Sequence, residues 1–386
     1  MANLHDYLKW RGDLPFAFVP LSEPDGLTLT RFAYMPFESV QFDSMETIGS
    51  LCKKLKKLPE EQFRLEGDLR FVKLLEDADR FNQLPVTDFV KENDEKRVIQ
   101  FAAVTIHLPE EMAYIAYCGT DSTLLGWKED FYMSFMEDVP AQRAALAYAT
   151  RIADQYPGKK LILGGHSKGG NLAIYAAVNL PEEQKARIVH VSDYDGPGFP
   201  QDYIDAHDFG TLLDRLESFL PQESMVGRIH EHAKAFNVVE STEKGLNQHN
   251  VYSWKVRRTE LKRLEQTEES SEVAYHTIRN VLNMTSPEQR HQYVDTVFDL
   301  LSVKDVVDLS DLGDNLSRVG TNVLKTLSKL PADEWDDVQD INAALVKAYL
   351  EAMREVHMDK LPDVSDLVEK IPLKTSMQEI TDFLKI

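Results

Sequence analysis

The segment at residues 161–177, LILGGHSKGGNLAIYAA, restricts the fold more than any other part of the chain. An apolar run stops at two glycines, one serine follows between His166 and Lys168, and two more glycines precede helix-like sequence. Glycines on both sides of the serine permit a turn that is too tight for larger side chains. The segment therefore predicts a buried strand that runs directly into a helix, with Ser167 at the turn.

Residues 95–256 alternate between strand-like and helix-like segments. Strands are expected at RVIQFAAVTIHL, MAYIAYCGT, KLILGG, RIVHVSDYD, LESFL and KAFNVVEST, with KAFNVVEST as the last of them. Helices are expected at residues 140–156 and 168–179. This alternation predicts an α/β fold, with a mostly parallel central sheet flanked by helices.

The chain divides into three segments on this pattern. Residues 1–94 are expected to pack on the α/β core at residues 95–256, and residues 257–386 to form a helical C-terminal region. Apolar residues recur there every three or four positions. One series is Leu309, Leu312, Leu316, Val319, Val323, Leu327 and Leu330, and another is Val338, Ile341, Leu345, Ala348, Ala352 and Val356. These stripes favour packing on the core or on each other, with partner or membrane binding as the alternative.

Net charge limits the partners that are expected, and cysteine content limits the expected cellular location. A formal net charge of -21 repels phosphate backbones, so no nucleic-acid partner is expected. The same charge disfavours binding to a surface of anionic lipid. A membrane surface is therefore kept as an alternative partner, but the sequence does not indicate it. The cysteines, Cys52 and Cys118, lie far apart, which suits a reducing cytoplasm. The start, MANLHDYLKWRGD, has no apolar signal region, and a cytoplasmic location is expected.

The turn that contains Ser167 suggests the first hypothesis about the chemistry of the chain. Residues 165–169 match G-x-S-x-G between an expected strand and an expected helix, which is the setting of a nucleophilic serine. The start of a helix favours nearby negative charge, and the amide of Lys168 can donate to an oxyanion. Ser167 is therefore the candidate nucleophile, and an inert serine in a glycine-rich turn is the alternative.

An acid and a histidine follow in the order that such a triad requires. Asp195 comes after RIVHVSD, at the start of a Gly-Pro-Gly turn, and is the favoured acid; its alternative role is to cap that turn. Glu223, in SFLPQESMVG, is the rival acid. His249 lies in the loop after KAFNVVEST and is the candidate base, with a surface histidine as the alternative.

The loop after the second expected strand, in IAYCGTDSTLLGWKEDF, supplies the other candidates. The amide of Thr120 or Asp121 is expected to be the second oxyanion donor. The candidates for a substrate pocket are Trp127, Phe131, Met133 and Phe135, with core packing as the alternative.

No metal or organic cofactor is expected. His230 and His232 form the pattern HxH, but on a helix their side chains would point about 200° apart. No cysteine or acidic cluster completes a ligand set around them.

The stretches GGHSKGGNLA and YCGTDSTLLGWKEDF resemble the α/β-hydrolase superfamily near the class 3 (fungal-type) lipases. The chain more closely resembles a bacterial α/β-hydrolase family of unknown function. The further stretches that carry this resemblance are DYLKWRGDLPF, YDGPGF, PQESMVG and QHNVYSW, and together they span roughly residues 3–256. The resemblance implies Ser167 as nucleophile, His249 as base, and Thr120 with Lys168 as the oxyanion pair.

The resemblance leaves the acid open. In class 3 lipases the carboxylate follows the strand that corresponds to LESFL, where this chain has Ser224 with Glu223 beside it. In pancreatic-type lipases the acid follows the preceding strand, which favours Asp195. Cys118 departs from the relatives, which tend to carry a basic residue before GTD.

These features predict a serine hydrolase that cleaves a small-molecule ester or lipid through a Ser-His-Asp triad and an acyl-enzyme. A thioesterase, peptidase or acyltransferase would use the same triad. The alternative from another class is a catalytically idle binding or scaffold protein on the same fold.

Overall fold

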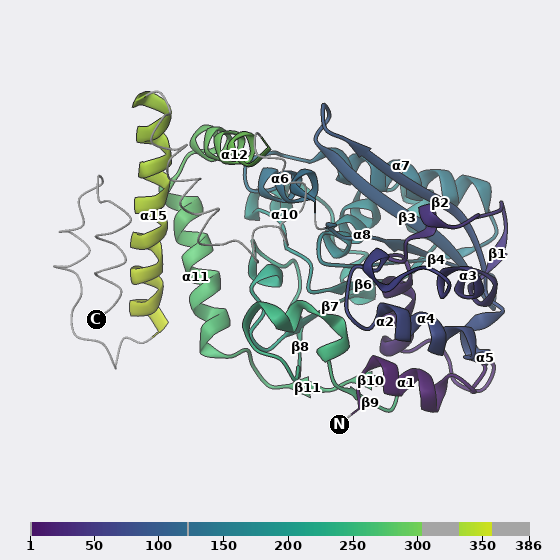
Figure 1. Cartoon of the computed structure of the whole chain (residues 1–386). Coiled ribbons are helices and arrows are strands. Elements are labelled where there is room, and N and C mark those ends of the chain that lie inside the picture. The colour runs from purple at the N-terminus through teal and green to yellow at the C-terminus, as the bar shows by residue number, and fades with distance from the viewer. Residues whose placement is uncertain (1, 122, 303–331, 357–386) are drawn as a thin grey trace. The chain divides into compact units, whose positions relative to one another are not determined.

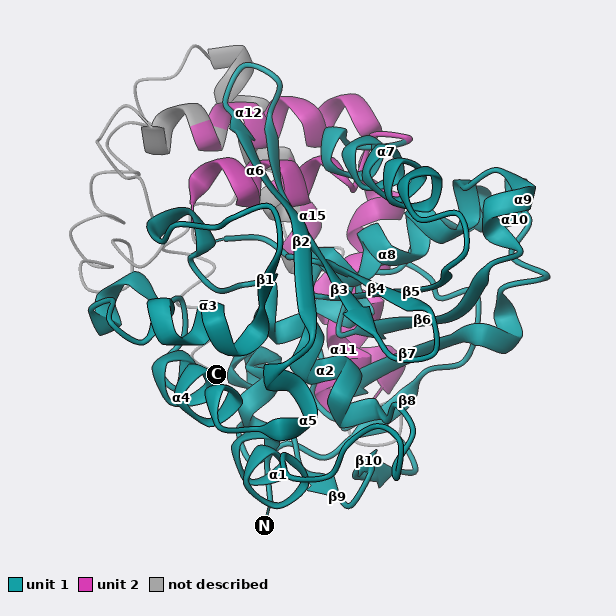
Figure 2. Ribbon diagram, turned by 90° about the vertical axis from the view of Figure 1, so that its right-hand side faces the viewer, with its two compact units in different colours: residues 1–121, 138–268 teal, residues 122–137, 269–386 magenta. Residues whose placement is uncertain are grey.

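A computed structural model of the chain describes residues 2–121, 123–302 and 332–356. The chain forms two compact units, which Figure 2 shows in different colours. Unit 1 comprises residues 1–121 and 138–268, and unit 2 comprises residues 122–137 and 269–386. The first predicted segment thus shares a unit with most of the α/β segment. Residues 122–137, from the middle of that segment, group with the C-terminal region.

Unit 1 is built on a nine-stranded sheet, whose order is β1-β2-β3-β4-β5-β6-β7-β8-β11 (Figure 1). Its strands are β1 (Glu46–Thr47), β2 (Pro85–Asp94), β3 (Ile99–Leu108), β4 (Met112–Tyr117), β5 (Lys160–His166), β6 (Ile188–Tyr194), β7 (Leu216–Pro221), β8 (Asn237–Val239) and β11 (Arg263–Leu264). A separate two-stranded ribbon is formed by β9 (Val256–Arg257) and β10 (Glu260–Leu261).

The sheet is mixed, so the prediction of a mostly parallel sheet was wrong in this respect. The pairs from β4 to β8 are parallel, but the pairs from β1 to β4 and the pair β8–β11 are antiparallel. Residues 109–111 alone join β3 to β4, and so short a connection forces two neighbouring strands to be antiparallel. KAFNVVEST is also not the last strand, because β11 follows it and pairs with β8.

Helices cover both faces of the sheet, as predicted. The helices of unit 1 are α1 (Leu4–Arg11), α2 (Glu23–Phe32), α3 (Ile48–Leu55), α4 (Asp68–Glu76), α5 (Asp79–Asn82), α7 (Pro140–Gln155), α8 (Lys168–Asn179), α9 (Glu182–Lys185) and α10 (Gln201–Ala206). Side chains alternate along each strand, so Leu161 and Leu163 share a core with α7 and α8. Ile162 points to the opposite core, which the N-terminal helices build. This double burial explains the continuous apolar run at residues 161–163 of β5.

Two buried ion pairs hold the N-terminal helices together. The guanidinium of Arg31 donates to both carboxylate oxygens of Asp68, at 2.9 and 2.5 Å. Arg80 contacts both oxygens of Asp25 at 2.8 and 2.6 Å. All four side chains are almost fully buried, so the loss of one partner would leave an uncompensated charge.

Unit 2 is helical in its described part. It contains α6 (Leu124–Tyr132), α11 (Glu269–Met284), α12 (Pro287–Ser302) and α15 (Ala332–Val356). The Tyr132 hydroxyl donates to Asp295 on α12 at 2.5 Å, and Lys128 pairs with the same carboxylate at 2.9 Å. Helix α6 is therefore fixed to α12, although the chain reaches α12 much later.

The two apolar series of the C-terminal region have different outcomes. The series from Val338 to Val356 falls on α15, where Ile341, Ala348 and Ala352 are buried and Leu345 is exposed. The series from Leu309 to Leu330 lies outside the described residues. In the part of the chain that the structure describes, no helix has both the length and the apolar character needed to cross a membrane.

Candidate active site

The turn between β5 and α8 places Ser167 in a strained backbone conformation, with φ 57° and ψ -137°. Positive φ is unfavourable for a residue with a side chain and is kept only where the surroundings impose it. A Cβ at Gly165 would lie 1.9 Å from the Gly169 carbonyl oxygen, and a Cβ at Gly169 would lie 2.4 Å from that of Tyr117. Glycine is therefore required on both sides of the serine.

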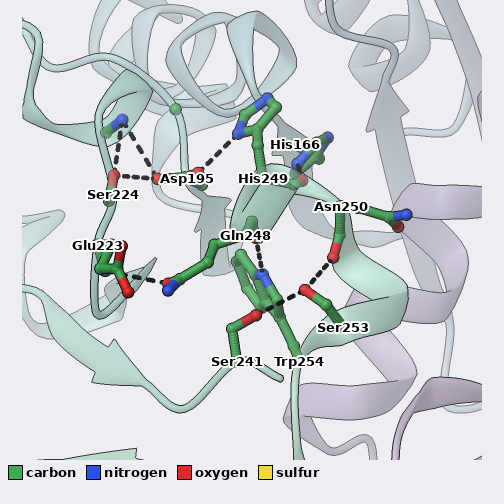
Figure 3. Close-up of polar contacts among 12 residues, drawn as sticks. His166, Asp195, Glu223, Ser224, Ser241, Gln248, His249, Asn250, Ser253 and Trp254 are labelled. Atoms are coloured by element: carbon green, nitrogen blue, oxygen red, sulfur yellow. Dashed lines mark hydrogen bonds and ion pairs between the residues drawn. The ribbon is translucent and has the colours of Figure 1, made fainter. Parts of the chain in front are cut away.

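Asp195 and His249 meet next to this turn (Figure 3). Asp195 directly follows β6, and His249 ends the 3-10 helix η5 (Gly245–His249). The imidazole Nδ1 donates to Asp195 Oδ2 at 2.6 Å. Asp195 Oδ1 accepts hydrogen bonds from the Ser224 hydroxyl at 2.5 Å and from the Gly227 amide at 3.2 Å. With 1% of its surface exposed, the carboxylate is held in one orientation, which in turn orients the imidazole.

Glu223, the rival acid, contacts other residues of the loop that carries His249. Its Oε2 accepts from the Gly245 amide at 2.9 Å, and its own amide donates to Gln248 Oε1 at 3.0 Å. Figure 3 shows Glu223 apart from the imidazole, beside Gln248. Asp195 and not Glu223 thus contacts His249, while Ser224, next to Glu223, donates to Asp195.

Ser167 is 7% exposed, and within the described residues no hydrogen bond joins its hydroxyl to His249. His166 contacts the histidine instead, with 4.3 Å between the ring centroids and 2.9 Å between its Nε2 and the His249 carbonyl oxygen. A carbonyl only accepts hydrogen bonds, so His166 Nε2 carries the proton. Burial holds the pKa of His166 well below its usual range, so this ring is neutral beside the candidate base.

Two side chains fix the amides of the loop after β4. The Gly119 amide donates to the Tyr34 hydroxyl at 2.8 Å, and the Asp121 amide donates to Gln100 Oε1 at 3.3 Å. The bond to Gln100 counts against Asp121 as an oxyanion donor. Thr120, the other candidate, lies between these two fixed amides and is 2% exposed.

Lys168 combines a backbone amide at the start of α8 with a buried side chain. Its ammonium donates to the Gln100 carbonyl oxygen at 3.0 Å and to Gln100 Oε1 at 2.9 Å. Gln100 therefore connects the residue after the candidate nucleophile to the candidate oxyanion loop.

Tyr34, which follows α2, is a site residue that the sequence analysis missed. Its hydroxyl donates to the His166 carbonyl oxygen at 2.8 Å, lies 3.2 Å from His166 Nδ1, and accepts from the Gly119 amide. Tyr34 thus joins the serine turn to the oxyanion loop. No motif marks it, because its partners lie 85 and 132 residues further along the chain.

We expect Tyr34→Phe to lower kcat for ester hydrolysis roughly 10- to 100-fold with little change in KM, because the Gly119 amide loses its acceptor and the oxyanion loop can shift. Steady-state kinetics with a chromogenic ester would measure this. Tyr114→Phe is the matched control, since that hydroxyl is equally buried but bonds Thr30 and Gly26. Equal kcat losses in the two variants would show that Tyr34 has only a structural role.

Asp193, two residues before Asp195, is a fully buried carboxyl group. Its Oδ1 accepts from the Gly196 amide at 2.9 Å, and a Cβ at Gly170 would lie 2.0 Å from that oxygen. Burial raises the pKa of Asp193 to about 8, and the charge of Asp195 adds to the effect. Asp193 is therefore mostly protonated at neutral pH and supports the serine turn as a neutral group.

This raised pKa predicts a pH-dependent stability. The pKa of Asp193 is about 8 when folded and about 3.9 when unfolded, so stability is lost as the pH rises through that window. Asp193→Asn removes the ionisation, so the variant should not lose this stability as the pH rises. We expect the free energy of unfolding of the variant, relative to that of wild type, to be higher at pH 8 than at pH 5 by on the order of 3 kcal/mol. Urea denaturation at both pH values measures the difference. Asp13→Asn, at an exposed aspartate, is the control, and a gain independent of pH would contradict the prediction.

The four predicted pocket residues lie in unit 2, on or just after α6. The Phe131 ring lies 5.8 Å from that of Phe298, and the Phe135 ring lies 5.0 Å from that of His291, both on α12. Met133 is buried and Trp127 is half-buried. Their use as a substrate pocket remains a prediction.

The HxH pair forms no metal cluster in the structure. His232 Nε2 lies 2.6 Å from the Gly227 carbonyl oxygen. Among the described residues, no group of three histidine, cysteine or acidic side chains is placed to hold a metal ion.

Comparison with known proteins identifies a family whose model spans more than half of the chain. A family model described as Mbeg1-like matches residues 75–299. No curated protein matches the chain.

Among solved structures, the chain is similar to lipase II from Rhizopus niveus, at 11% identity over 62% of this chain and 85% of that one, with a TM-score of 0.36. A lipase from Rhizopus microsporus var. chinensis is 13% identical over 56% of this chain and 71% of that one, with a TM-score of 0.33. Similarity at this level does not establish a shared fold or activity.

Proposed function

The chain belongs to the Mbeg1-like family, and we propose that it is a serine hydrolase that cleaves carboxylic esters on an α/β-hydrolase fold. The observation that carries this proposal is the 2.6 Å contact between His249 Nδ1 and the buried Asp195 Oδ2, next to the strained turn that bears Ser167. A serine, a histidine and an oriented carboxylate in this chain order are the groups that acyl transfer requires.

In the proposed mechanism Ser167 Oγ attacks the ester carbonyl carbon while His249 Nε2 takes its proton. Asp195 keeps Nδ1 protonated and stabilises the imidazolium. The amides of Lys168 and Thr120 hold the oxyanion, and each such donor is worth about 3 kcal/mol. The alcohol leaves with the proton from Nε2, and an acyl-enzyme remains. Water then attacks the acyl carbon, His249 takes its proton, and the carboxylic acid and free serine are formed.

The proposed substrate is a small-molecule ester or lipid, and the residues of the chain supply every group in this mechanism. We also propose a cytoplasmic location, since Cys52 and Cys118 are both buried free thiols. Thioester or alcohol-acceptor chemistry would use the same groups.

Labelling with a fluorophosphonate probe, followed by mass mapping of the adduct, tests this function. We expect one adduct, on Ser167, and strongly slowed labelling in His249→Ala because the serine loses its base. A series of p-nitrophenyl esters from acetate to palmitate would then define the accepted acyl length. A protein that is folded but not labelled, or labelled at another serine, would contradict the proposal.

Binding or scaffolding without turnover is the second candidate. One observation favours it, namely that within the described residues no hydrogen bond joins Ser167 to His249. In ligand-free hydrolases this bond is often long and shortens when substrate binds. The labelling experiment separates the two, because an idle protein would react no faster at Ser167 than at other serines.

A further inference from the structure

A cavity of about 560 Å³ lies beside the proposed base in unit 1. His166 and His249 form part of its wall, and Ser167 does not line it. The N-terminal segment contributes Arg31 and Arg64 to the wall. The loop that follows β8 contributes most of the remaining wall residues, among them three with amide or carboxylate side chains, Glu243, Asn247 and Asn250.

The two arginines differ in whether their charge is neutralised. Arg31 is buried and makes the two-bond ion pair with Asp68. Arg64 is exposed, and within the described residues no carboxylate lies in ion-pair distance of its guanidinium. Its guanidinium lies over the face of the Tyr34 ring, 5.1 Å from the centroid. Arg64 therefore brings an unneutralised positive charge to this cavity.

The charge of Arg64 acts on His166, the residue before the candidate nucleophile. Next to burial and His249, Arg31 and Arg64 are the causes that keep the pKa of His166 low. Glu243 is the one carboxylate in the cavity wall, and it forms no ion pair with Arg64 among the described residues.

We propose that this cavity binds an anionic group carried by the leaving alcohol of the ester, with Arg64 as its main contact. The inference rests on the proposed hydrolase function. His249 Nε2 must hand its proton to the leaving oxygen, so the alcohol has to lie beside His249. The cavity wall contains His249 but not Ser167, so we assign the cavity to the alcohol side of the site.

The chemistry of the wall indicates the class of anion. A guanidinium binds carboxylate and phosphate oxygens through two parallel N–H donors. The side-chain amides of Asn247 and Asn250 can add neutral donors. The expected substrate is thus an ester of an alcohol that bears a phosphate or carboxylate group.

A pair of esters that differ by one charge tests the inference. We would measure kcat/KM for 4-nitrophenyl butyrate and for its 3-carboxy analogue, and take the ratio of the charged to the neutral ester. Arg64→Gln should lower this ratio about tenfold, mainly through KM of the charged ester. Glu243→Gln should raise the ratio, because it removes the one anion of the wall. Arg70→Gln, at an exposed arginine outside the cavity, is the matched control and should leave the ratio unchanged.

A second readout does not depend on turnover of either ester. sn-Glycerol 3-phosphate and 3-hydroxypropionate are added separately during fluorophosphonate labelling of the whole protein, to distinguish phosphate from carboxylate. Slower labelling of wild type that is relieved in Arg64→Gln supports the inference. If wild type is labelled at Ser167 but neither the anions nor Arg64→Gln change rate or ratio, the inference fails and the proposed function stands. If the folded protein is not labelled at all, the proposed function fails, and the inference with it.

Discussion

Ser167→Ala should reduce ester hydrolysis by about 10⁴-fold or more, because the variant has no oxygen that can attack the carbonyl carbon. The residual rate would come from the oxyanion amides and from binding alone. Steady-state hydrolysis of a p-nitrophenyl ester, together with fluorophosphonate labelling, measures the loss. This is the largest single effect that the proposed mechanism predicts.

The folded state should tolerate this change. The alanine side chain meets the same backbone strain at φ 57° as serine does, so we expect the free energy of unfolding to change by less than about 1 kcal/mol. Ser192→Ala is a matched control, since Ser192 is a buried serine on β6, away from the turn. Activity that survives in Ser167→Ala, or is lost equally in Ser192→Ala, would rule out Ser167 as the nucleophile.

Asp195→Asn should lower kcat by about 10⁴-fold, whereas Glu223→Gln should change it less than about threefold. The asparagine amide is nearly isosteric, and its oxygen can still accept from Ser224 and Gly227. It carries no charge to stabilise the imidazolium and does not enforce the tautomer with Nδ1 protonated. The same assay, run on both variants, measures the difference.

Glu223→Gln is the matched change, at the rival acid on the loop after β7. The glutamine oxygen can still accept from the Gly245 amide, so the loop that carries His249 should stay in place. Thermal unfolding of both variants separates loss of catalysis from loss of structure. If Glu223→Gln were the more damaging change in a folded protein, the acid would have to be reassigned to Glu223.

Much of the fold could be predicted because the central strands carry strong apolar patterns. The α/β class, helices on both faces and a helical C-terminal region are confirmed, and β3 to β8 lie where strands were expected. The strands that were missed are β1, β2 and the two-residue strands β9, β10 and β11. β1 and β11 have two residues each, and β2 ends in the charged sequence KEND, so their place depends on pairing with a neighbour and not on burial.

The residues of the candidate site likewise fall into two groups, those that the sequence could predict and those that it could not. Ser167, Asp195 and His249 were proposed from local motifs and chain order, and the structure places Asp195 and His249 in contact. Tyr34 and Gln100 could not be found in this way. Each acts through one hydroxyl or amide group on a partner far along the chain, and no spacing in the sequence records such a contact.

Unit 2 is formed by two segments that lie far apart in the sequence, and this has a consequence for the synthesis of the chain. Phe131 and Tyr132 contact Phe298 and Asp295 on α12, yet residues 138–268 must all be translated before unit 2 can be completed. At roughly 5–20 residues per second, this interval lasts on the order of ten seconds. During that time the aromatic side chains of α6 have left the ribosome without their partners. Exposed apolar side chains promote aggregation, so a chaperone that covers α6 in this interval would protect the nascent chain.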